Sequence, residues 1–597
     1  MDLRLDQQAI LQLLQPGSRK DLAIPEEERL AILEKPFAAP YLKTLEDYAE
    51  RFRGKPIPSL PYSTFKLYYE TGDRALYEDG ENGYFPRRGR LAAFGMLAWL
   101  YGRKEDIDEL CDVIWAICDE YTWSVPAHLI NEPEYSAYVN KLESGDWMVD
   151  LFASETGQAL SEIAFLLGDK LPEIIRRRIA HEVRVRIFDR VLNNDFGWMT
   201  ITNNWAAVCA GSVGMAAIHA IEDEELLATV LARVLPAFGY FLSGFAEDGS
   251  CLEGIGYWSY GFSYFTSFAE LLCRRTGGKF DLFEDETVHK IAAFQQKCYF
   301  PGGRTVSFSD GASRSHYHMG VTSFLANRYD DVLLPPASCS SQNFSGDHCY
   351  RWTNVLHDLL WAVPVHESED LPPRTHLLPA AQWYLSTNKN GVSLAAKAGN
   401  NDEPHNHNDI GSFQVFVRGE ELLADLGSGE YTRQYFSPAR YEYFVCGSQG
   451  HSVPMVDGCV QKAGKEACAK DVELTENGIS MECAAAYQLE ALTSLKRSIA
   501  FDDNVTVTDA FVLTGGEHEI KERFITWGGA EVCDGFVRLS LNGQAARLHY
   551  DAKVFDVTVT PTSYSGHLGM KKDCCIVDFT AKAEGAFTAQ FVIKPVI

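Results

Sequence analysis

The chain has 597 residues, which is too long for one ordinary hydrophobic core and predicts two or three domains. Hydrophobic residues make up 46% of the sequence and aromatic residues 12%, as expected of packed globular domains. The formal charge of −28, from 82 acidic and 54 basic residues, argues against nucleic acid as a partner, because phosphate binding needs a basic surface. The same charge is unfavourable for a polyanionic sugar, although a few arginines can reverse the potential inside a cleft.

The first half of the chain carries helical periodicity. Residues 1–60 are expected to form a peripheral helical segment, and from about residue 90 to 362 apolar residues recur at spacings of three and four. Turn-forming residues separate the amphipathic stretches, which are 91–101, 107–121, 155–167, 171–191, 205–221, 224–242, 264–275 and 288–298. Consecutive helices joined by short loops predict a helical bundle, solenoid or toroid over residues 61–365.

The second half alternates with the period of β-strands. Residues 363–374 are rich in proline and charge and are predicted to be a linker. Short alternating runs follow, separated by turn residues, at 391–396, 412–417, 421–425, 472–474, 505–509, 519–524, 537–541, 555–559 and 587–593. This pattern predicts an antiparallel β-sandwich over residues 375–597.

Targeting features and cysteine usage predict a cytoplasmic protein. Residues 1–8 have no basic region followed by an apolar run, and no stretch approaches the roughly 18 apolar residues of a membrane span. The 15 cysteines are odd in number and scattered, without a Cys-x-x-Cys motif, which favours reduced thiols. We therefore expect neither a membrane nor a nucleic acid as partner.

Residues 405–409, His-Asn-His-Asn-Asp, hold two imidazoles two positions apart. The residues after them alternate like a strand, so the motif is expected to enter or lie on a β-strand with His405 and His407 on one face. Imidazole suits both proton transfer near neutral pH and metal binding. Asp425 and His451 follow, and a His/Asp/His set suits a zinc-like cation with one position left for water. The alternative interpretation is a solvated polar loop.

Three motifs together resemble the heparinase II/III-like family of polysaccharide lyases. They are Asn203-Asn204-Trp205 at a helix start, residues 252–261 (Leu-Glu-Gly-Ile-Gly-Tyr-Trp-Ser-Tyr-Gly), and the His-Asn-His-Asn-Asp segment. The resemblance covers roughly residues 90–597. It implies a multidomain α+β protein in which an N-terminal α/α toroid precedes a C-terminal antiparallel β-sandwich.

The resemblance also implies β-elimination of an anionic, uronate-containing oligosaccharide or polysaccharide, of glycosaminoglycan type first and alginate type second. This chemistry needs a group to offset the carboxylate charge, a base for the C5 proton and an acid for the leaving oxygen. Asn203 or Asn204 matches the first group, although asparagine here also suits helix capping, so we expect one to cap and one to face the cleft. Tyr257 and His405 match the proton-transferring pair, with Tyr260 as the reserve tyrosine.

His407, Asp425 and His451 match the family's metal site, which implies a divalent cation, zinc or a similar transition ion, in a structural role. Weaker candidates for substrate binding complete the predicted site, and for each of them ordinary packing or a surface charge is the competing interpretation: Arg88, His128, Trp205, Glu253, Tyr260 and Arg304.

Two other classes of function stay open from the residues. A glycoside hydrolase on an α/α toroid would need two opposed carboxylates, and Glu253 with Asp146, Glu155 or Asp310 could supply them. A non-catalytic scaffold that binds carbohydrate or metal through the β-sandwich is the third possibility. Phosphate-binding loops, dinucleotide fingerprints and Gly-x-Ser-x-Gly are absent from the sequence, so neither a nucleotide cofactor nor a serine triad is indicated.

Overall fold

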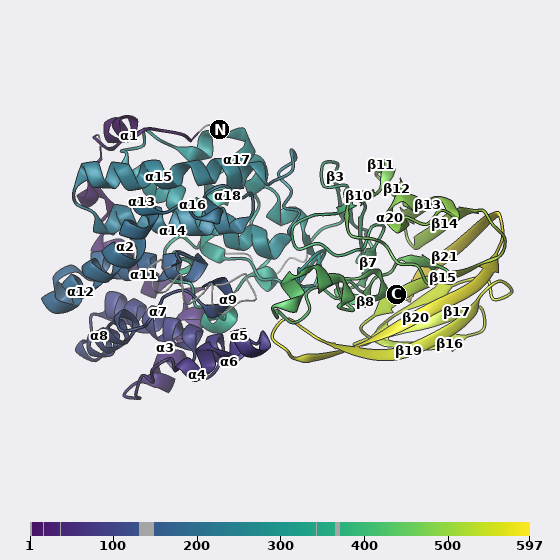
Figure 1. Cartoon of the computed structure of the whole chain (residues 1–597), viewed down its shortest axis with the longest axis horizontal. Helices are drawn as coiled ribbons and strands as arrows, with labels where there is room; N and C mark the ends of the chain where they lie inside the picture. The colour runs from purple at the N-terminus through teal and green to yellow at the C-terminus, as the bar shows by residue number, and fades with distance from the viewer. Residues whose placement is uncertain are drawn as a thin grey trace.

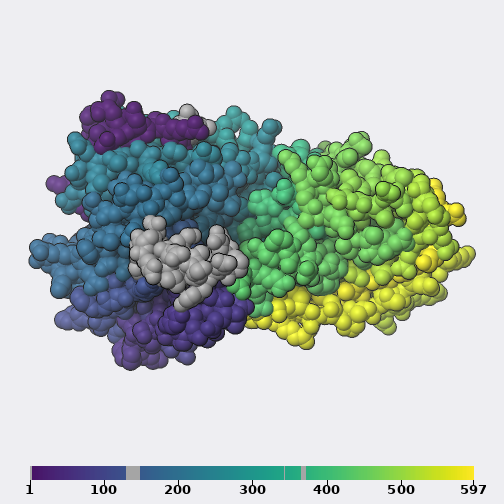
Figure 2. Space-filling view, viewed as in Figure 1, coloured from purple at the N-terminus to yellow at the C-terminus, as the bar shows by residue number. Residues whose placement is uncertain are grey.

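The computed structural model describes residues 3–15, 17–35, 37–129, 148–341, 343–364 and 371–596. A helical half, coloured purple to teal, and a strand half, coloured green to yellow, lie end to end along the long axis (Figure 1). Their surfaces meet along a broad face in the space-filling view (Figure 2). The predicted fold class is confirmed. Part of the predicted linker, residues 365–370, lies outside the described residues.

The N-terminal segment contributes to the core of the helical half. It contains α1 (Gln7–Leu14), α2 (Glu26–Glu34) and α3 (Ala38–Phe52), followed by the short helices α4 (Tyr62–Phe65), α5 (Leu67–Thr71) and α6 (Ala75–Glu78). Helix α1 packs on α15 and α3 packs on α7, and their buried faces belong to the same hydrophobic cluster as the helices that follow. The segment is therefore helical, and it packs against the toroid helices α7 and α15.

The toroid helices follow the predicted stretches closely. They are α7 (Tyr84–Tyr101), α8 (Lys104–Cys118), α9 (Pro126–Leu129), α11 (Leu151–Leu167), α12 (Glu173–Val183), α13 (Asp189–Asn193), α14 (Asn204–Ala220), α15 (Glu224–Ser243), α16 (Ile255–Arg275), α17 (Glu286–Ala292), α18 (Met319–Arg328) and α19 (Trp352–Leu360). The stretch predicted as one helix over 171–191 is interrupted by a π-helical turn, Arg184–Phe188, between α12 and α13.

Helices α14 and α16 run side by side in the same direction. A Cβ added to Gly211 would lie 3.0 Å from the Tyr264 carbonyl oxygen, and one added to Gly214 would lie 2.3 Å from the Phe268 ring. The contacting positions advance together along both helices, so the helices are parallel and begin at the same end of the toroid. The glycines permit this close approach. Both predicted catalytic motifs of the toroid are thereby brought to one end.

Helix α15 is long and apolar enough to cross a membrane by length and composition alone. It packs on α14 and α1, and its buried side chains form part of the main hydrophobic cluster. Core helices commonly satisfy the same composition test, so α15 is weak support for a membrane span.

The strand half contains three larger antiparallel sheets. The eight-stranded sheet has the order β11 (Lys470–Thr475), β12 (Gly478–Glu482), β13 (Leu492–Phe501), β14 (Val505–Leu513), β21 (Ala586–Val596), β18 (Gln544–His549), β17 (Phe536–Leu541) and β16 (Gly529–Cys533). The four-stranded sheet has the order β19 (Asp556–Ser565), β20 (Lys571–Ala583), β15 (His518–Thr526) and β9 (Pro454–Val456). Buried phenylalanines from β15, β20 and β21 contact one another between them.

A five-stranded sheet joins the two halves. Its strands are β3 (Arg374–Leu378), β4 (Trp383–Thr387), β5 (Val392–Lys397), β7 (Phe413–Val417) and β8 (Glu420–Leu423). Alternate side chains of β5 point to opposite faces, so Ala395 packs in the helical cluster while Leu394 packs in the sandwich cluster. Two small pairs complete the strands: β6 (Asn400–Asn401) with β10 (Gly464–Cys468), and β1 (Tyr299–Phe300) with β2 (Arg304–Thr305).

Candidate active site

A cleft of about 740 Å³ is lined by both halves of the protein. The toroid contributes the ends of α14 and α16, and the strand half contributes the loop before β7 and residues 430–437. Seven of the residues predicted from the sequence line this single cleft: His128, Asn203, Asn204, Trp205, Tyr257, Tyr260 and His405. Residues almost 280 positions apart in the chain therefore meet at one site, as the resemblance implied.

The His-Asn-His-Asn-Asp motif lies in the loop between β6 and β7 rather than on a strand. It leads into β7, as expected, but it is irregular because His405 adopts a left-handed backbone conformation with φ 55°. Such a conformation is costly for a residue with a Cβ, and where it occurs it commonly orients a functional side chain. Here it directs the His405 imidazole toward the cleft, with 20% of the side chain exposed.

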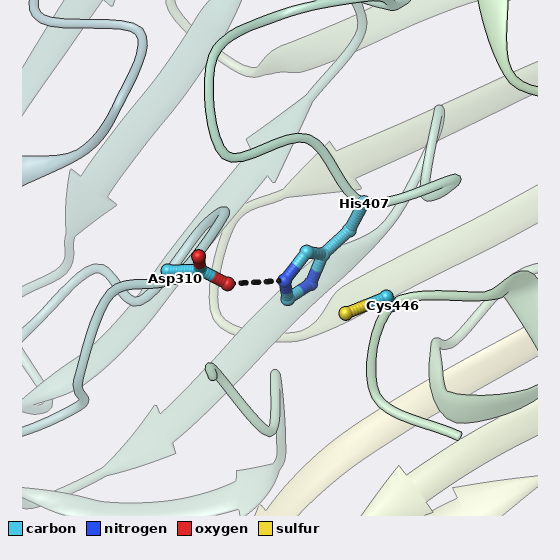
Figure 3. A group of neighbouring side chains, drawn as sticks. All are labelled: Asp310, His407 and Cys446. Carbon is cyan, nitrogen blue, oxygen red and sulfur yellow. Dashed lines mark hydrogen bonds and ion pairs between the residues drawn. The ribbon is translucent and has the colours of Figure 1, made fainter. Parts of the chain in front are cut away.

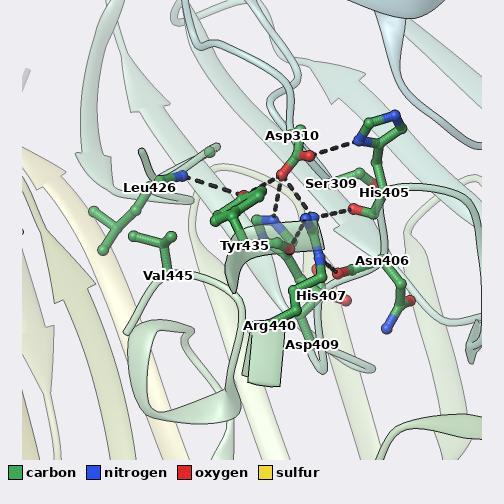
Figure 4. A network of polar contacts seen from close by, with 12 residues as sticks. Ser309, Asp310, His405, Asn406, His407, Asp409, Leu426, Tyr435, Arg440 and Val445 are labelled. Atoms are coloured by element: carbon green, nitrogen blue, oxygen red, sulfur yellow. Dashed lines mark hydrogen bonds and ion pairs between the residues drawn. The ribbon is translucent and has the colours of Figure 1, made fainter. Parts of the chain in front are cut away.

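The buried carboxylate of Asp310 holds the motif together (Figure 4). Its side chain is fully buried, and its two oxygens accept hydrogen bonds from five donors. These are His405 Nδ1 at 2.7 Å, His407 Nε2 at 3.0 Å, the Tyr431 hydroxyl at 3.0 Å, the Arg440 guanidinium at 2.8 Å and the Tyr435 hydroxyl. Burial alone would raise the pKa of Asp310, but the hydrogen bonds from both histidines hold it well below its ordinary value.

Asp310 fixes the tautomers of both histidines. An ionised carboxylate can only accept hydrogen bonds, so His405 donates from Nδ1 and His407 donates from Nε2. When neutral, His405 consequently carries its lone pair on Nε2, and His407 carries its own on Nδ1. One aspartate thus prepares one ring nitrogen as a base and another as a metal ligand.

Tyr257 lies on the first turn of α16 and stacks on His405, with ring centroids 4.0 Å apart. Its hydroxyl lies 2.6 Å from the Tyr431 hydroxyl, which itself donates to Asp310. Burial, and next the charge of Asp310, raise the pKa of Tyr257 well above its ordinary value. The phenol is therefore held in its protonated, donating form at neutral pH.

Asn203 combines the two roles that the sequence left open between the asparagines. Its Oδ1 accepts a hydrogen bond of 3.1 Å from Trp205 N and caps α14. Because only the amide oxygen can accept that bond, the Asn203 amide nitrogen is left as a donor on a residue that lines the cleft. Asn204 also lines the cleft, but its side chain is almost fully buried.

Three predicted binding residues do not line the cleft. Arg88 is buried on α7 and forms a bidentate pair with Glu120, at 2.6 and 2.8 Å, so its guanidinium is occupied within the toroid. Arg304 is buried between the halves and bonds Glu420 at 2.7 Å and the Gly419 carbonyl. Glu253 lines a small neighbouring cavity behind Tyr257, where burial raises its pKa to about 7. The prediction that Arg88, Arg304 and Glu253 bind substrate directly is therefore corrected, because none of the three lines the cleft.

The carboxylates considered for a hydrolase are not opposed across the cleft. Asp310 is saturated by donors, and Glu155 is held at 2.6 Å by the Tyr260 hydroxyl and at 3.2 Å by Arg351. Glu253 is behind Tyr257. Asp146 lies outside the described residues. Within the described residues, therefore, none of the carboxylates proposed from the sequence supplies the free, facing pair that hydrolysis of a glycosidic bond needs.

His407, Asp425 and His451 converge on one buried point beside the cleft. Their candidate ligand atoms lie within 4.8 Å of one another, and His451 Nδ1 is 3.4 Å from Asp425 Oδ2. All three of the facing atoms, His407 Nδ1, Asp425 Oδ2 and His451 Nδ1, are buried without a hydrogen-bond partner. His451 Nε2 donates to the Val445 carbonyl at 2.8 Å, which leaves its Nδ1 lone pair free. These groups fit a divalent transition ion, whose ligands around a tetrahedron would lie about 3.3 Å apart.

A second group of ligand types shares His407. Asp310 and the Cys446 sulfur lie on opposite sides of the His407 ring (Figure 3), and the three meet the same distance test. Asp310 already accepts five hydrogen bonds, so it has no free lone pair for an ion. The set with Asp425 and His451 is therefore the better candidate metal site.

Several cleft residues could not be located by sequence motifs. Tyr431 links Tyr257 to Asp310, and Phe436 offers a ring that is 53% exposed and suited to the apolar face of a sugar. Arg351 lies over the Tyr260 ring at 3.9 Å. Tyr431 and Phe436 belong to an irregular segment of short 3-10 turns, which carries no periodic pattern. Their aromatic spacing was the only available signal.

The family model of the heparinase II/III-like C-terminal domain matches residues 370–562. These residues form a heparinase II/III-like domain. The resemblance inferred from the motifs is thereby confirmed for the strand half. The search of curated proteins gave no match to the chain.

Three solved structures share the fold of this chain over 96–97% of its length. A heparinase III gene product is 14% identical, with a TM-score of 0.59 over 97% of this chain and 85% of its own. A heparan sulfate lyase mutant from Pedobacter heparinus is 13% identical, with a TM-score of 0.58 over 97% and 93%. The chondroitin AC lyase of Streptomyces coelicolor A3, in complex with chondroitin sulphate, is 10% identical, with a TM-score of 0.56 over 96% and 82%. At these identities the similarity establishes the fold.

Proposed function

We propose that this protein is a polysaccharide lyase that cleaves a uronate-containing glycan by β-elimination. The observation that carries the proposal is the meeting of Asn203, Tyr257 and His405 in one cleft, with Asp310 fixing the histidine tautomer. These groups supply a carboxylate-binding amide, a proton donor and a proton acceptor, which are the three requirements of the reaction. The substrate class is glycosaminoglycan-type oligosaccharides, with alginate-type uronates as the second choice.

The amide of Asn203 binds the uronate carboxyl group. Hydrogen bonds from its nitrogen offset the charge that develops on the carboxyl oxygens when the C5 proton leaves. The cap bond to Trp205 N holds the amide in the required orientation. The N-terminus of the 17-residue helix α14 adds a favourable partial positive charge at the same place.

His405 removes the C5 proton through Nε2, since Nδ1 is occupied by Asp310. The imidazolium that forms is stabilised by the same carboxylate. Electrons from the C5–H bond form the C4=C5 double bond, and the C4–O bond breaks. Tyr257 gives its hydroxyl proton to the departing oxygen, and the Tyr431 hydroxyl, 2.6 Å away, can then turn from Asp310 and donate its proton to a hydrogen bond with the phenolate.

A divalent ion, zinc or a similar transition ion, would be held by His407 Nδ1, Asp425 Oδ2 and His451 Nδ1. It would supply charge that orders the loop carrying His405, because His407 is tied to Asp310 on its other nitrogen. It has no contact with the uronate in this scheme. Its role is therefore structural.

The proposal is tested with oligosaccharides of heparan, chondroitin, hyaluronan and alginate. Elimination creates a conjugated double bond that absorbs in the ultraviolet, and hydrolysis does not. At least one member should give ultraviolet-absorbing fragments. Saturated fragments from a cleaved member, with no absorbing product from any, would instead indicate a hydrolase.

A further inference from the structure

The charged side chains that line the cleft are nearly balanced. Among the described lining residues, four carboxylates meet three arginines, and none is a lysine: Asp73, Glu78, Asp79 and Glu430 against Arg74, Arg351 and Arg433. A site that reads sulfate groups would be expected to present unpaired arginines or lysines to them. The described cleft residues, with nearly equal numbers of acidic and basic side chains, do not form such a sulfate-binding site.

Two of the three arginines are already paired. Arg74 Nε bonds both carboxylate oxygens of Glu78, at 2.9 and 2.8 Å. Arg351 bonds Asp347 at 2.6 Å and Glu155 at 3.2 Å. Both guanidinium groups are therefore already bonded to carboxyl groups before any substrate enters.

Arg433 is the exception. It is exposed, and its guanidinium donates only to the Tyr69 carbonyl, at 3.4 Å, among the described residues. No carboxylate of the described ranges forms an ion pair with it, so one cationic group is available at the cleft wall. One such group suits the carboxylate of a second uronate in the same chain.

Neutral histidines add no positive charge at pH 7. Burial lowers the pKa of His128 and of His348, and it lowers the pKa of His567 to about 4. Asp79 and Glu430 line the cleft and form no ion pair with a cation among the described residues, although burial raises the pKa of Asp79 above its ordinary value. Sulfate groups entering beside them would be repelled.

We propose that the cleft selects uronate glycans that carry no sulfate, with Asp79 and Glu430 rejecting sulfated chains and Arg433 binding one further carboxylate. The inference rests on the proposed β-elimination and narrows its substrate class. It predicts that unsulfated chondroitin and the unsulfated heparan backbone are cleaved faster than their sulfated counterparts. The ratio of kcat/KM should be at least about tenfold for each matched pair, since one repelled charge near a partly buried carboxylate is worth about that factor.

The first experiment compares the two matched pairs by ultraviolet absorbance at low and at high salt. Because exposed charges are screened within about 10 Å at 0.1 M salt and within about 3 Å at 1 M, the preference should shrink as salt rises. Arg433→Ala should raise KM for unsulfated chains longer than one disaccharide, with a smaller effect on kcat.

The second experiment removes the repelling charges. The double variant Asp79→Asn, Glu430→Gln should bring the ratio of unsulfated to sulfated turnover toward one. The matched control is Asp169→Asn, Glu173→Gln. It also removes one aspartate and one glutamate charge, but at and near α12, far from the strand half (Figure 1). The control should keep the preference of the unchanged protein.

Three outcomes are distinguishable. Preference for unsulfated chains that falls in salt and in the cleft variant supports the inference. Equal or faster turnover of sulfated chains overturns it while leaving the proposed lyase activity intact. Absence of unsaturated product from both members of every pair overturns both.

Discussion

The imidazole of His405 lies flat against the phenol of Tyr257, with ring centroids 4.0 Å apart and 20° between the ring planes. Two rings at this separation are in van der Waals contact, so no sugar ring fits between them. The base and the acid therefore approach the uronate from the same side. The C5 proton and the C4 oxygen must then lie on one face of the sugar, which is a syn elimination.

This arrangement predicts a preference between C5 epimers. D-Glucuronate has its C5 hydrogen and C4 oxygen on the same face, and L-iduronate has them on opposite faces. An unsulfated glucuronate polymer should be cleaved at least about tenfold faster than its C5-epimerised form, because a misplaced base loses most of the 10²–10⁴-fold benefit of proton transfer. Initial rates of ultraviolet absorbance measure the ratio. Faster cleavage of the iduronate form would mean that His405 and Tyr257 separate to opposite faces of the sugar.

The two tyrosines that bind Asp310 make a matched pair of variants. Tyr431 contacts both Asp310 and the Tyr257 hydroxyl, whereas Tyr435 bonds Asp310 and has no hydrogen bond to Tyr257. Tyr431→Phe should lower kcat by about 10-fold or more with little change in KM, and Tyr435→Phe should lower it less. Tyr257→Phe should lower kcat by about 10²–10⁴-fold. Equal effects of Tyr431→Phe and Tyr435→Phe would show that Tyr431 acts only through Asp310.

Substitution of Asn203 can separate its role as the N-cap of α14 from the role of its amide nitrogen as a donor to the uronate carboxyl group. Aspartate is an equally good N-cap, so Asn203→Asp should keep the melting temperature of the protein. It has no N–H to donate and would repel the uronate carboxylate, so turnover should fall by about 10²-fold or more. Asn203→Ala should lose both turnover and about 0.5–2 kcal/mol of stability. An active Asn203→Asp protein would exclude the amide from the reaction and leave Asn203 with its structural role alone.

The sequence predicted the fold well because both halves are periodic. Helices α7, α8, α11, α14 and α15 and strands such as β5, β7 and β14 appear where apolar spacing placed them. The start of α16 was missed, because Gly254 to Tyr257 carry no apolar stripe, although the motif there was recognised.

The site was predicted in part, and the missing parts are long-range. Asp310 was considered only as a hydrolase carboxylate, since nothing local links it to His405, 95 positions away. Arg88 was assigned to the cleft because a sequence does not reveal which face of a fully buried helix meets substrate. Its partner Glu120 is 32 positions away and becomes visible only in the packed toroid.

The metal prediction is tested without an activity assay. Elemental analysis should find about one transition ion per chain, and His451→Ala should lose it. Chelation should lower the melting temperature of the unchanged protein by several degrees, since loss of a tightly bound ion removes about 3 kcal/mol at a hundredfold excess over its dissociation constant. The same chelator should leave the melting temperature of the His451→Ala protein unchanged, because that variant has already lost the ion. His518→Ala is the control, because His518 pairs with Asp457 at 2.6 Å in a His–Asp contact that belongs to neither of the two candidate ligand groups described above. If the purified protein contains no transition ion and its melting temperature does not change with chelator, the metal site at His407, Asp425 and His451 is contradicted.

The central claim is that the glycosidic link breaks by elimination, and the most direct measurement follows the oxygen atom that water would supply. The protein is incubated with unsulfated glucuronate oligosaccharides in water enriched in heavy oxygen, and the fragments are weighed by mass spectrometry. Elimination predicts that one fragment is lighter, by one water molecule, than the fragment that hydrolysis would give, and that the cleavage step incorporates no heavy oxygen. The reaction should be lost in Tyr257→Phe and in His405→Ala. Heavy oxygen incorporated at each cleaved link, with all fragments saturated, would contradict the account.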